Sequence, residues 1–153
     1  MKQTVPLGRV AGIRVGMHWS VLIMVLLIGW LLGGQVLPST TPNQSAVAYW
    51  AVAVPCVAAF MAALLAHELA HSLIARRYGV PVTSITLWAL GGVSELGGQP
   101  PAARAELRIA AAGPATSLAA GLIFGGLAAA VRAGAGPGPG RASPWPRWAG
   151  WPR

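Results

Sequence analysis

Three residues near the middle of the chain have the types and spacing for shared chemistry: His67, Glu68 and His71 form the pattern His-Glu-x-x-His. In a helix, residues four apart share a face, so the two imidazoles can bind one metal ion. Glu68 projects from an adjoining direction and reaches a water molecule there without being a ligand. Zinc lowers the pKa of such a water toward about 7, and a nearby carboxylate takes its proton as the water attacks a carbonyl. The trio therefore predicts a metalloprotease site with zinc as cofactor.

The composition around this trio is that of a membrane protein. Apolar residues make up 55% of the chain and charged residues only 9%, whereas a soluble domain has about 25% charged residues. The formal net charge is +8, but the basic residues flank apolar runs instead of clustering on one soluble face, which excludes nucleic acid as a partner. Two His and one Glu within a membrane helix are costly unless they face a polar cavity, which argues against a chance match.

The elements that must position the trio are membrane spans. Apolar runs predict three of them, at about 17–37, 46–77 and 106–131, and 21 residues of helix extend about 32 Å, enough for a hydrocarbon core of about 30 Å. Residues 80–96 are rich in β-branched residues and glycine, which indicates a short β-hairpin or membrane-edge loop between the second and third spans. Residues 5–15 also have strand character. The predicted fold is an all-α membrane protein with one domain, residues 1–131.

The basic flanks also predict an orientation in the lipid bilayer. Positive residues precede the first span and follow the second, whereas the connection at 38–45 has none. By the positive-inside tendency, the N-terminus and residues 76–108 should be cytoplasmic in a multi-pass protein of the cell membrane. The histidine pair then lies toward the cytoplasmic side.

An ordered series of short motifs extends the pattern over residues 5–131. They are Gly8–Ile13 with Met17–Ser20, then His67–His71, Leu90–Val93 and Ala112–Pro114. Together they are far more specific than His-Glu-x-x-His alone. In this series the chain resembles the site-2 protease family of intramembrane zinc metalloproteases.

The resemblance implies roles for individual residues and a class of partner. His67 and His71 would be zinc ligands and Glu68 the catalytic base, acting on transmembrane segments of other membrane proteins in regulated proteolysis. A peptide bond in an intact helix is hidden, so the substrate must be extended, and a strand edge can hold it in that form. The family likeness assigns this edge to Leu90, Gly91, Gly92 and Val93.

The third zinc ligand of the family is an Asp in an Asp-Gly motif, and this sequence contains no Asp. Its alternatives are His18, Glu95 and Glu106. Each also has a plainer explanation: an interfacial histidine beside Trp19, a solvated loop charge, and an acidic residue in the first turn of a helix. Ser117 follows the Ala112–Pro114 motif, where the family resemblance allows a polar residue near the site, but the simplest expectation is that its hydroxyl bonds its own helix backbone.

Residues 132–153 are rich in Gly, Pro, Trp and Arg and have no periodic pattern. We expect a disordered tail, and the missing ligand suggests a truncated or frame-shifted product. A Trp-Arg segment that binds the lipid interface is the functional alternative.

Two other functions fit the same sequence. One is a catalytically inactive membrane scaffold that binds transmembrane partners without cutting them. The other is a small membrane metal carrier using His67, His71 and His18. Nothing in the sequence sets the oligomeric state.

Overall fold

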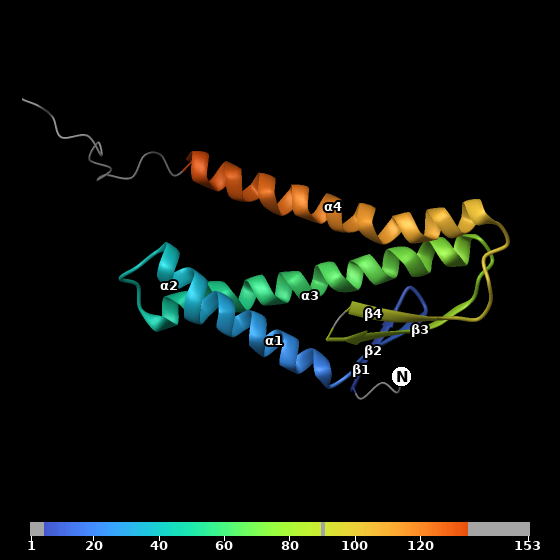
Figure 1. Ribbon diagram of the computed structural model, residues 1–153, viewed down its shortest axis with the longest axis horizontal. Helices are drawn as coiled ribbons and strands as arrows, with labels where there is room; N and C mark the ends of the chain where they lie inside the picture. The colour runs from blue at the N-terminus through green and yellow to red at the C-terminus, as the bar shows by residue number, and fades with distance from the viewer. Residues whose placement is uncertain (1–4, 90, 135–153) are drawn as a thin grey trace, which may run out of the picture. The chain divides into compact units, whose positions relative to one another are not determined.

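Three long helical segments dominate the structure, a computed structural model that describes residues 5–89 and 91–134 (Figure 1). The first consists of α1 (Ser20–Leu31), a π-helical stretch η1 (Leu32–Val36) and α2 (Leu37–Thr40). The second is α3 (Ala46–Arg77) and the third is α4 (Ala103–Gly134). Each segment is long and apolar enough to cross a membrane.

Local signals set the ends of α3, the helix that carries the candidate trio. Ser45 caps its beginning, where the Ser45 hydroxyl accepts a hydrogen bond from the Ala48 N–H at 3.2 Å. Arg76 and Arg77 lie in its last turn, where positive charge interacts favourably with the helix carbonyl end. The chain then turns at Gly79, whose φ of +77° suits a residue without a side chain.

A four-stranded sheet corrects the all-α expectation. Its strands are β1 (Val5–Val10), β2 (Ile13–Met17), β3 (Val82–Trp88) and β4 (Gly91–Leu96), in that spatial order. The two hairpins are antiparallel, and β2 pairs with β3 in parallel. The hairpin between the second and third helical segments is therefore present, but it shares one sheet with the N-terminal strands. Strand pairing between segments so far apart in sequence is not visible in local periodicity.

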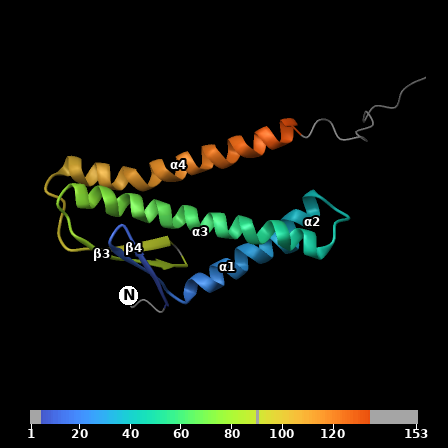
Figure 2. The same ribbon diagram turned by 180° about the vertical axis from the view of Figure 1, so that it is seen from behind.

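The hydrophobic core joins this sheet to α1 and α3. Its fully buried side chains are Ile13, Val21, Ile85 and Leu87, with partly buried methionines and leucines of α1 and α3 packed around them. In both views the C-terminal half of α3 lies between the sheet and the first half of α4 (Figures 1 and 2). One face of α3 is therefore covered by the sheet and another by α4.

The chain divides into two compact units within α4, the first ending at Ala120. The candidate site lies entirely in the first unit. The described part of the second unit, residues 121–134, is an exposed apolar continuation of the helix with Arg132 in its last turn.

Candidate metal centre

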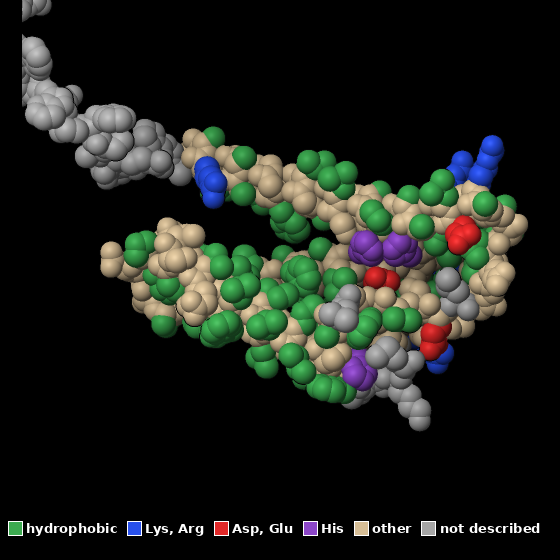
Figure 3. Space-filling model, viewed as in Figure 1, with side chains coloured by type: hydrophobic (Ala, Val, Ile, Leu, Met, Phe, Trp, Pro, Cys, Tyr) green, Lys and Arg blue, Asp and Glu red, His purple; other side chains and the backbone are tan. Residues whose placement is uncertain are grey.

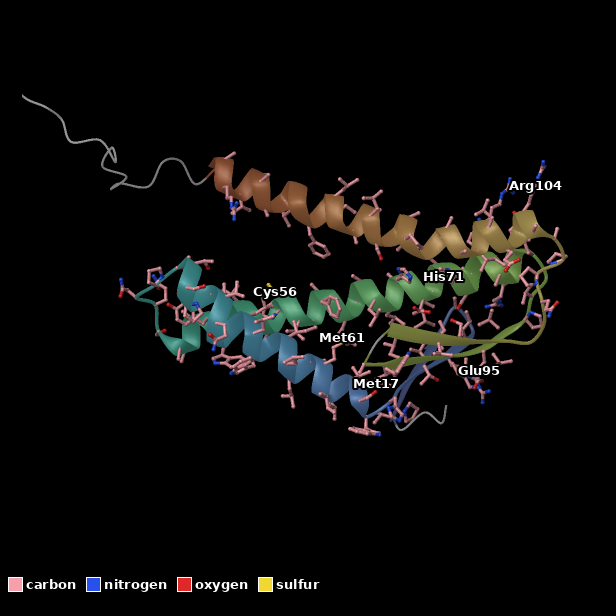
Figure 4. All side chains as sticks on the ribbon, viewed as in Figure 1. Met17, Cys56, Met61, His71, Glu95 and Arg104 are labelled. Atoms are coloured by element: carbon pink, nitrogen blue, oxygen red, sulfur yellow. The ribbon has the colours of Figure 1, made fainter. Side chains whose placement is uncertain are left out.

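The side chains of His67 and His71 converge on one point. Their Nε2 atoms are 3.0 Å apart and their rings meet edge to face, with centroids 4.7 Å apart. Two zinc–nitrogen bonds at a tetrahedral angle hold their nitrogens ~3.3 Å apart, so the pair is close to the spacing that one zinc ion requires. Figure 3 shows two histidine side chains side by side with an acidic side chain next to them, and Figure 4 labels His71 between α3 and α4.

Helix α4 orients both rings through their other nitrogens. The Nδ1 atom of His71 lies 2.7 Å from the Ile109 carbonyl oxygen, and Nδ1 of His67 lies 2.7 Å from the Ser117 hydroxyl. A carbonyl only accepts, so Nδ1 of His71 carries a proton, and in the neutral ring Nε2 then has the lone pair that a metal needs. Metal-ligating histidines commonly donate their second N–H to such partners, which fixes both tautomer and ring direction.

A glycine of α4 leaves room at the point where the two rings converge. Gly113 is buried, and an added Cβ would lie 2.5 Å from Nε2 of His67, 2.6 Å from Cε1 of His71 and in overlap with the Nε2 atom of His71. The absence of a side chain at Gly113 therefore leaves a space that lies within ligand distance of the Nε2 atoms of both His67 and His71. By this test the residues present fit a zinc ion with two imidazole ligands.

One stripe of α4 provides all of these contacts. Ile109, Gly113 and Ser117 are spaced by four residues and so share a helix face. Sequence reasoning found the motif at Gly113 but missed its steric role and that of Ile109. For Ser117 the plainer expectation, a bond to its own helix, was wrong, because its hydroxyl lies 2.7 Å from Nδ1 of His67. The neighbouring Thr116 makes a bond of that kind, to the Ala112 carbonyl at 2.9 Å. The four-residue spacing from Gly113 was the available signal.

Glu68 faces the sheet and not α4. Its side chain is buried, and an added Cβ on Gly92 of β4 would lie 2.9 Å from its Oε1 atom and overlap its Cγ and Cδ atoms. One turn further along α3, the fully buried Ser72 hydroxyl lies 3.1 Å from that of Ser94 in β4. The edge strand β4 therefore lies along the face of α3 that carries Glu68, the glutamate face.

The residues expected to form a substrate edge are only partly described. Gly91 begins β4 with a φ of +144°, and Gly92 contacts Glu68 as above. Val93 is 40% exposed on the same strand. Leu90 lies outside the described residues.

No third metal ligand joins the pair within residues 5–89 and 91–134, where no three His, Cys, Asp or Glu side chains converge. The Nδ1 atom of His18 lies 2.9 Å from the Ser20 hydroxyl, and its ring packs beside Trp19. Glu95 accepts a hydrogen bond from Ser84 at 2.6 Å beside the sheet (Figure 4). Glu106 is exposed in the first turn of α4. The structure thus brings the side chains of His67 and His71 together and places Glu68 on the neighbouring face of α3, whereas none of the three alternatives joins the pair.

Comparison with protein families gives one match, to peptidase family M50, over residues 55–135. The matched segment contains the histidine pair, Glu68, the β3–β4 hairpin and α4. It covers more than half of the chain.

Individual relatives and one solved structure point in the same direction. Over 128 residues the chain is 50% identical to Rip3 of Mycobacterium tuberculosis, covering 84% of this chain and 32% of that protein. It is 32% identical to zinc metalloprotease MJ0392 of Methanocaldococcus jannaschii, covering 81% and 32%. The solved structure is a site-2 protease from Methanocaldococcus jannaschii, 26% identical, with a TM-score of 0.55 over 78% of this chain and 48% of that one. The chain spans about a third of the length of these curated relatives.

Proposed function

This chain belongs to peptidase family M50, the site-2 protease family, and from that premise we propose that it carries the catalytic pair of ligands and the base of a zinc-dependent intramembrane endopeptidase. The family resemblance seen in the sequence is confirmed. With three helical segments able to cross a membrane, the chain is a multi-pass membrane protein. The observation that carries the proposal is the convergence of His67 and His71 on the space beside Gly113, with Glu68 one residue away.

The chain divides the chemistry between its residues. A bound zinc ion supplies Lewis acidity, which activates water and polarises a carbonyl. His67 and His71 would hold the ion through their Nε2 atoms, and the contacts of their Nδ1 atoms with α4 hold the rings in place. Glu68 accepts the proton of the attacking water and delivers it to the leaving amine, the general acid–base role that contributes about 10²- to 10⁴-fold in rate.

We propose that the substrate is a transmembrane segment of another protein, extended along β4. This strand lies at the edge of the sheet, so its outer backbone groups are free of strand partners in the order β1-β2-β3-β4. A chain added to such an edge is held by main-chain hydrogen bonds in the extended form that hydrolysis needs. Because Gly92 touches Glu68, a peptide added beside Gly91–Val93 would lie close to the base.

The test is a set of three full-length chains in lipid vesicles, assayed for bound zinc and for cleavage of a transmembrane peptide. Wild type should bind one zinc and cleave, Glu68→Gln should bind zinc and cleave at least about 10²-fold more slowly, and His67→Ala should lose both. A wild-type chain without zinc would contradict the metal centre.

An inactive membrane scaffold is the second candidate, and one observation favours it. Catalytic zinc sites take three ligands from protein, and the described residues bring only two together. In the same assay this function predicts weak zinc binding, no cleavage, and capture of the transmembrane peptide that is equal for wild type and Glu68→Gln.

We also propose that the N-terminus and residues 76–108 face the cytoplasm of a cell membrane, because basic residues concentrate in these segments. Cys56 is the only cysteine, so a Cys56→Ser background allows single cysteines at Asn43 or Gln99. A membrane-impermeant maleimide added outside intact cells should label the cysteine at 43 and leave the one at 99 unlabelled. The reverse pattern would invert the proposed topology.

A further inference from the structure

A pocket with a volume of about 600 Å³ lies between the C-terminal end of α3 and the first half of α4. It is separate from the candidate metal centre, because neither histidine of the pair nor Glu68 lines it. From α3 and its C-cap residue it is lined by Ile74, Arg77 and Tyr78, and from α4 by Arg108 and three alanines. Polar and apolar lining residues thus come from both helices.

The polar part of the pocket carries two unneutralised positive charges. Arg77 and Arg108 are exposed, and they come from different helices. The Arg108 guanidinium donates a hydrogen bond to the Tyr78 hydroxyl at 2.7 Å, and neither arginine forms an ion pair within the part of the chain that the structure describes. Basic side chains also gather over the beginning of α4 on the face seen in Figure 3. Guanidinium groups bind phosphate with paired N–H donors, so the two arginines together suit one phosphate group.

The rest of the lining is apolar and made of small side chains. Ile74 of α3 faces Ala111 and Ala115 of α4, and these alanines leave width for an inserted hydrocarbon chain. Arg77 ends α3 and Arg108 lies in the second turn of α4, so both are at the ends of helices long enough to span a bilayer. A free phosphate ion would use the arginines and leave the apolar wall unused. An anionic lipid uses both.

We propose that this pocket binds one anionic phospholipid, with its phosphate on Arg77 and Arg108 and an acyl chain along Ile74, Ala111 and Ala115. Basic pockets between membrane helices are suited to anionic headgroups, because the charge attraction adds to the insertion of the chain. The proposal stands apart from peptidase activity, since it rests on none of the residues of the metal centre.

The experiment uses the full chain in phosphatidylcholine nanodiscs doped with phosphatidylglycerol, with native mass spectrometry after release to count retained lipids. Wild type should retain one phosphatidylglycerol in preference to phosphatidylcholine. Arg77→Gln/Arg108→Gln should weaken this retention by about 10- to 30-fold, the effect of two basic contacts at a membrane surface. The matched control Arg9→Gln/Arg14→Gln removes the same charge from exposed residues of β1 and β2 and should leave retention unchanged.

A third variant tests the acyl-chain wall and keeps the charge. Ala115→Leu fills the pocket and should lower retention of phosphatidylglycerol while both arginines remain. Equal losses in the arginine pair and its control would overturn the proposal, since they would show only general surface attraction. Unchanged retention in Ala115→Leu, or displacement of the lipid by inorganic phosphate or an acidic peptide, would also overturn it in favour of a site for soluble anions. Zinc content, measured on the same samples, reports separately on the metal centre.

Discussion

Two neighbouring faces of α3 carry the two halves of the candidate centre, and they are held in different ways. On the histidine face, hydrogen bonds between their Nδ1 atoms and α4 hold the rings of His67 and His71. On the glutamate face, the carboxylate of Glu68 lies against the bare backbone of Gly92. Within the described residues this carboxylate makes no hydrogen bond.

The difference between the two faces matches the roles proposed for these residues. A metal-ligating imidazole needs a proton on one ring nitrogen and needs the other nitrogen directed at the metal. A hydrogen-bond partner at the protonated nitrogen provides both. A base that accepts a proton from water needs unoccupied oxygens, and close packing can fix its position without occupying them. Four substitutions separate these two kinds of support.

Gly113→Ala should have the largest effect, because it blocks the proposed zinc position on the histidine face. The new Cβ would occupy the point where the two Nε2 atoms converge, so we expect the zinc content to fall from one per chain to near zero. Alanine favours helix over glycine by about 1 kcal/mol, so a weakened helix cannot account for the loss. Elemental analysis of the purified chain measures it. Gly121→Ala, a glycine of α4 in open space, is the control, and full zinc in Gly113→Ala would refute the assigned position.

Gly92→Ala should disturb the glutamate face and leave the histidine face unchanged. The added Cβ overlaps Glu68 and must displace its carboxylate, so cleavage of a transmembrane peptide should fall about 10²-fold or more while zinc binding is retained. Gly98→Ala is the matched control, because a Cβ there meets no neighbouring atom. If zinc and cleavage fell together, the two faces would not be independent.

Ser117→Ala sharpens the comparison by removing one hydrogen bond from the histidine face. Loss of the partner 2.7 Å from Nδ1 of His67 should weaken zinc affinity by about 10- to 100-fold, as is usual for the groups that orient metal ligands. Competition with a chelator gives this affinity. Thr116→Val removes the adjacent hydroxyl, which bonds only its own helix, and an equal loss in that variant would assign the effect to the helix instead.

Ser72→Ala should have the smallest effect and concerns packing of the glutamate face. It removes the contact between the hydroxyls of Ser72 and Ser94 at 3.1 Å, which should lower the free energy of unfolding by about 1 kcal/mol. Denaturation in detergent measures this, with exposed Ser39→Ala as the comparison. Zinc content should not change, and a decrease would mean that β4 supports the histidine face as well.

Much of the architecture could be predicted from local sequence. The three helical segments follow from the length and apolarity of their runs, because a span needs about 20 apolar residues whatever its neighbours. The β3–β4 hairpin follows from β-branched residues interrupted by Gly91 and Gly92. The all-α description omitted the sheet because the parallel pairing of β2 with β3 joins residues such as Arg14 and Ser84, which no local pattern connects.

By itself the sequence determined which residues are the candidates for the proposed chemistry, since a four-residue spacing on a helix places His67 and His71 on one face and Glu68 beside them. The tertiary structure decided what surrounds them. It set α4 against the histidines through Ile109 and Ser117, set Gly92 against the glutamate, and left His18, Glu95 and Glu106 away from the pair. The physical reason is range: helix periodicity acts over one turn, whereas the direction of each imidazole ring depends on a partner 38 or 50 residues away along the chain.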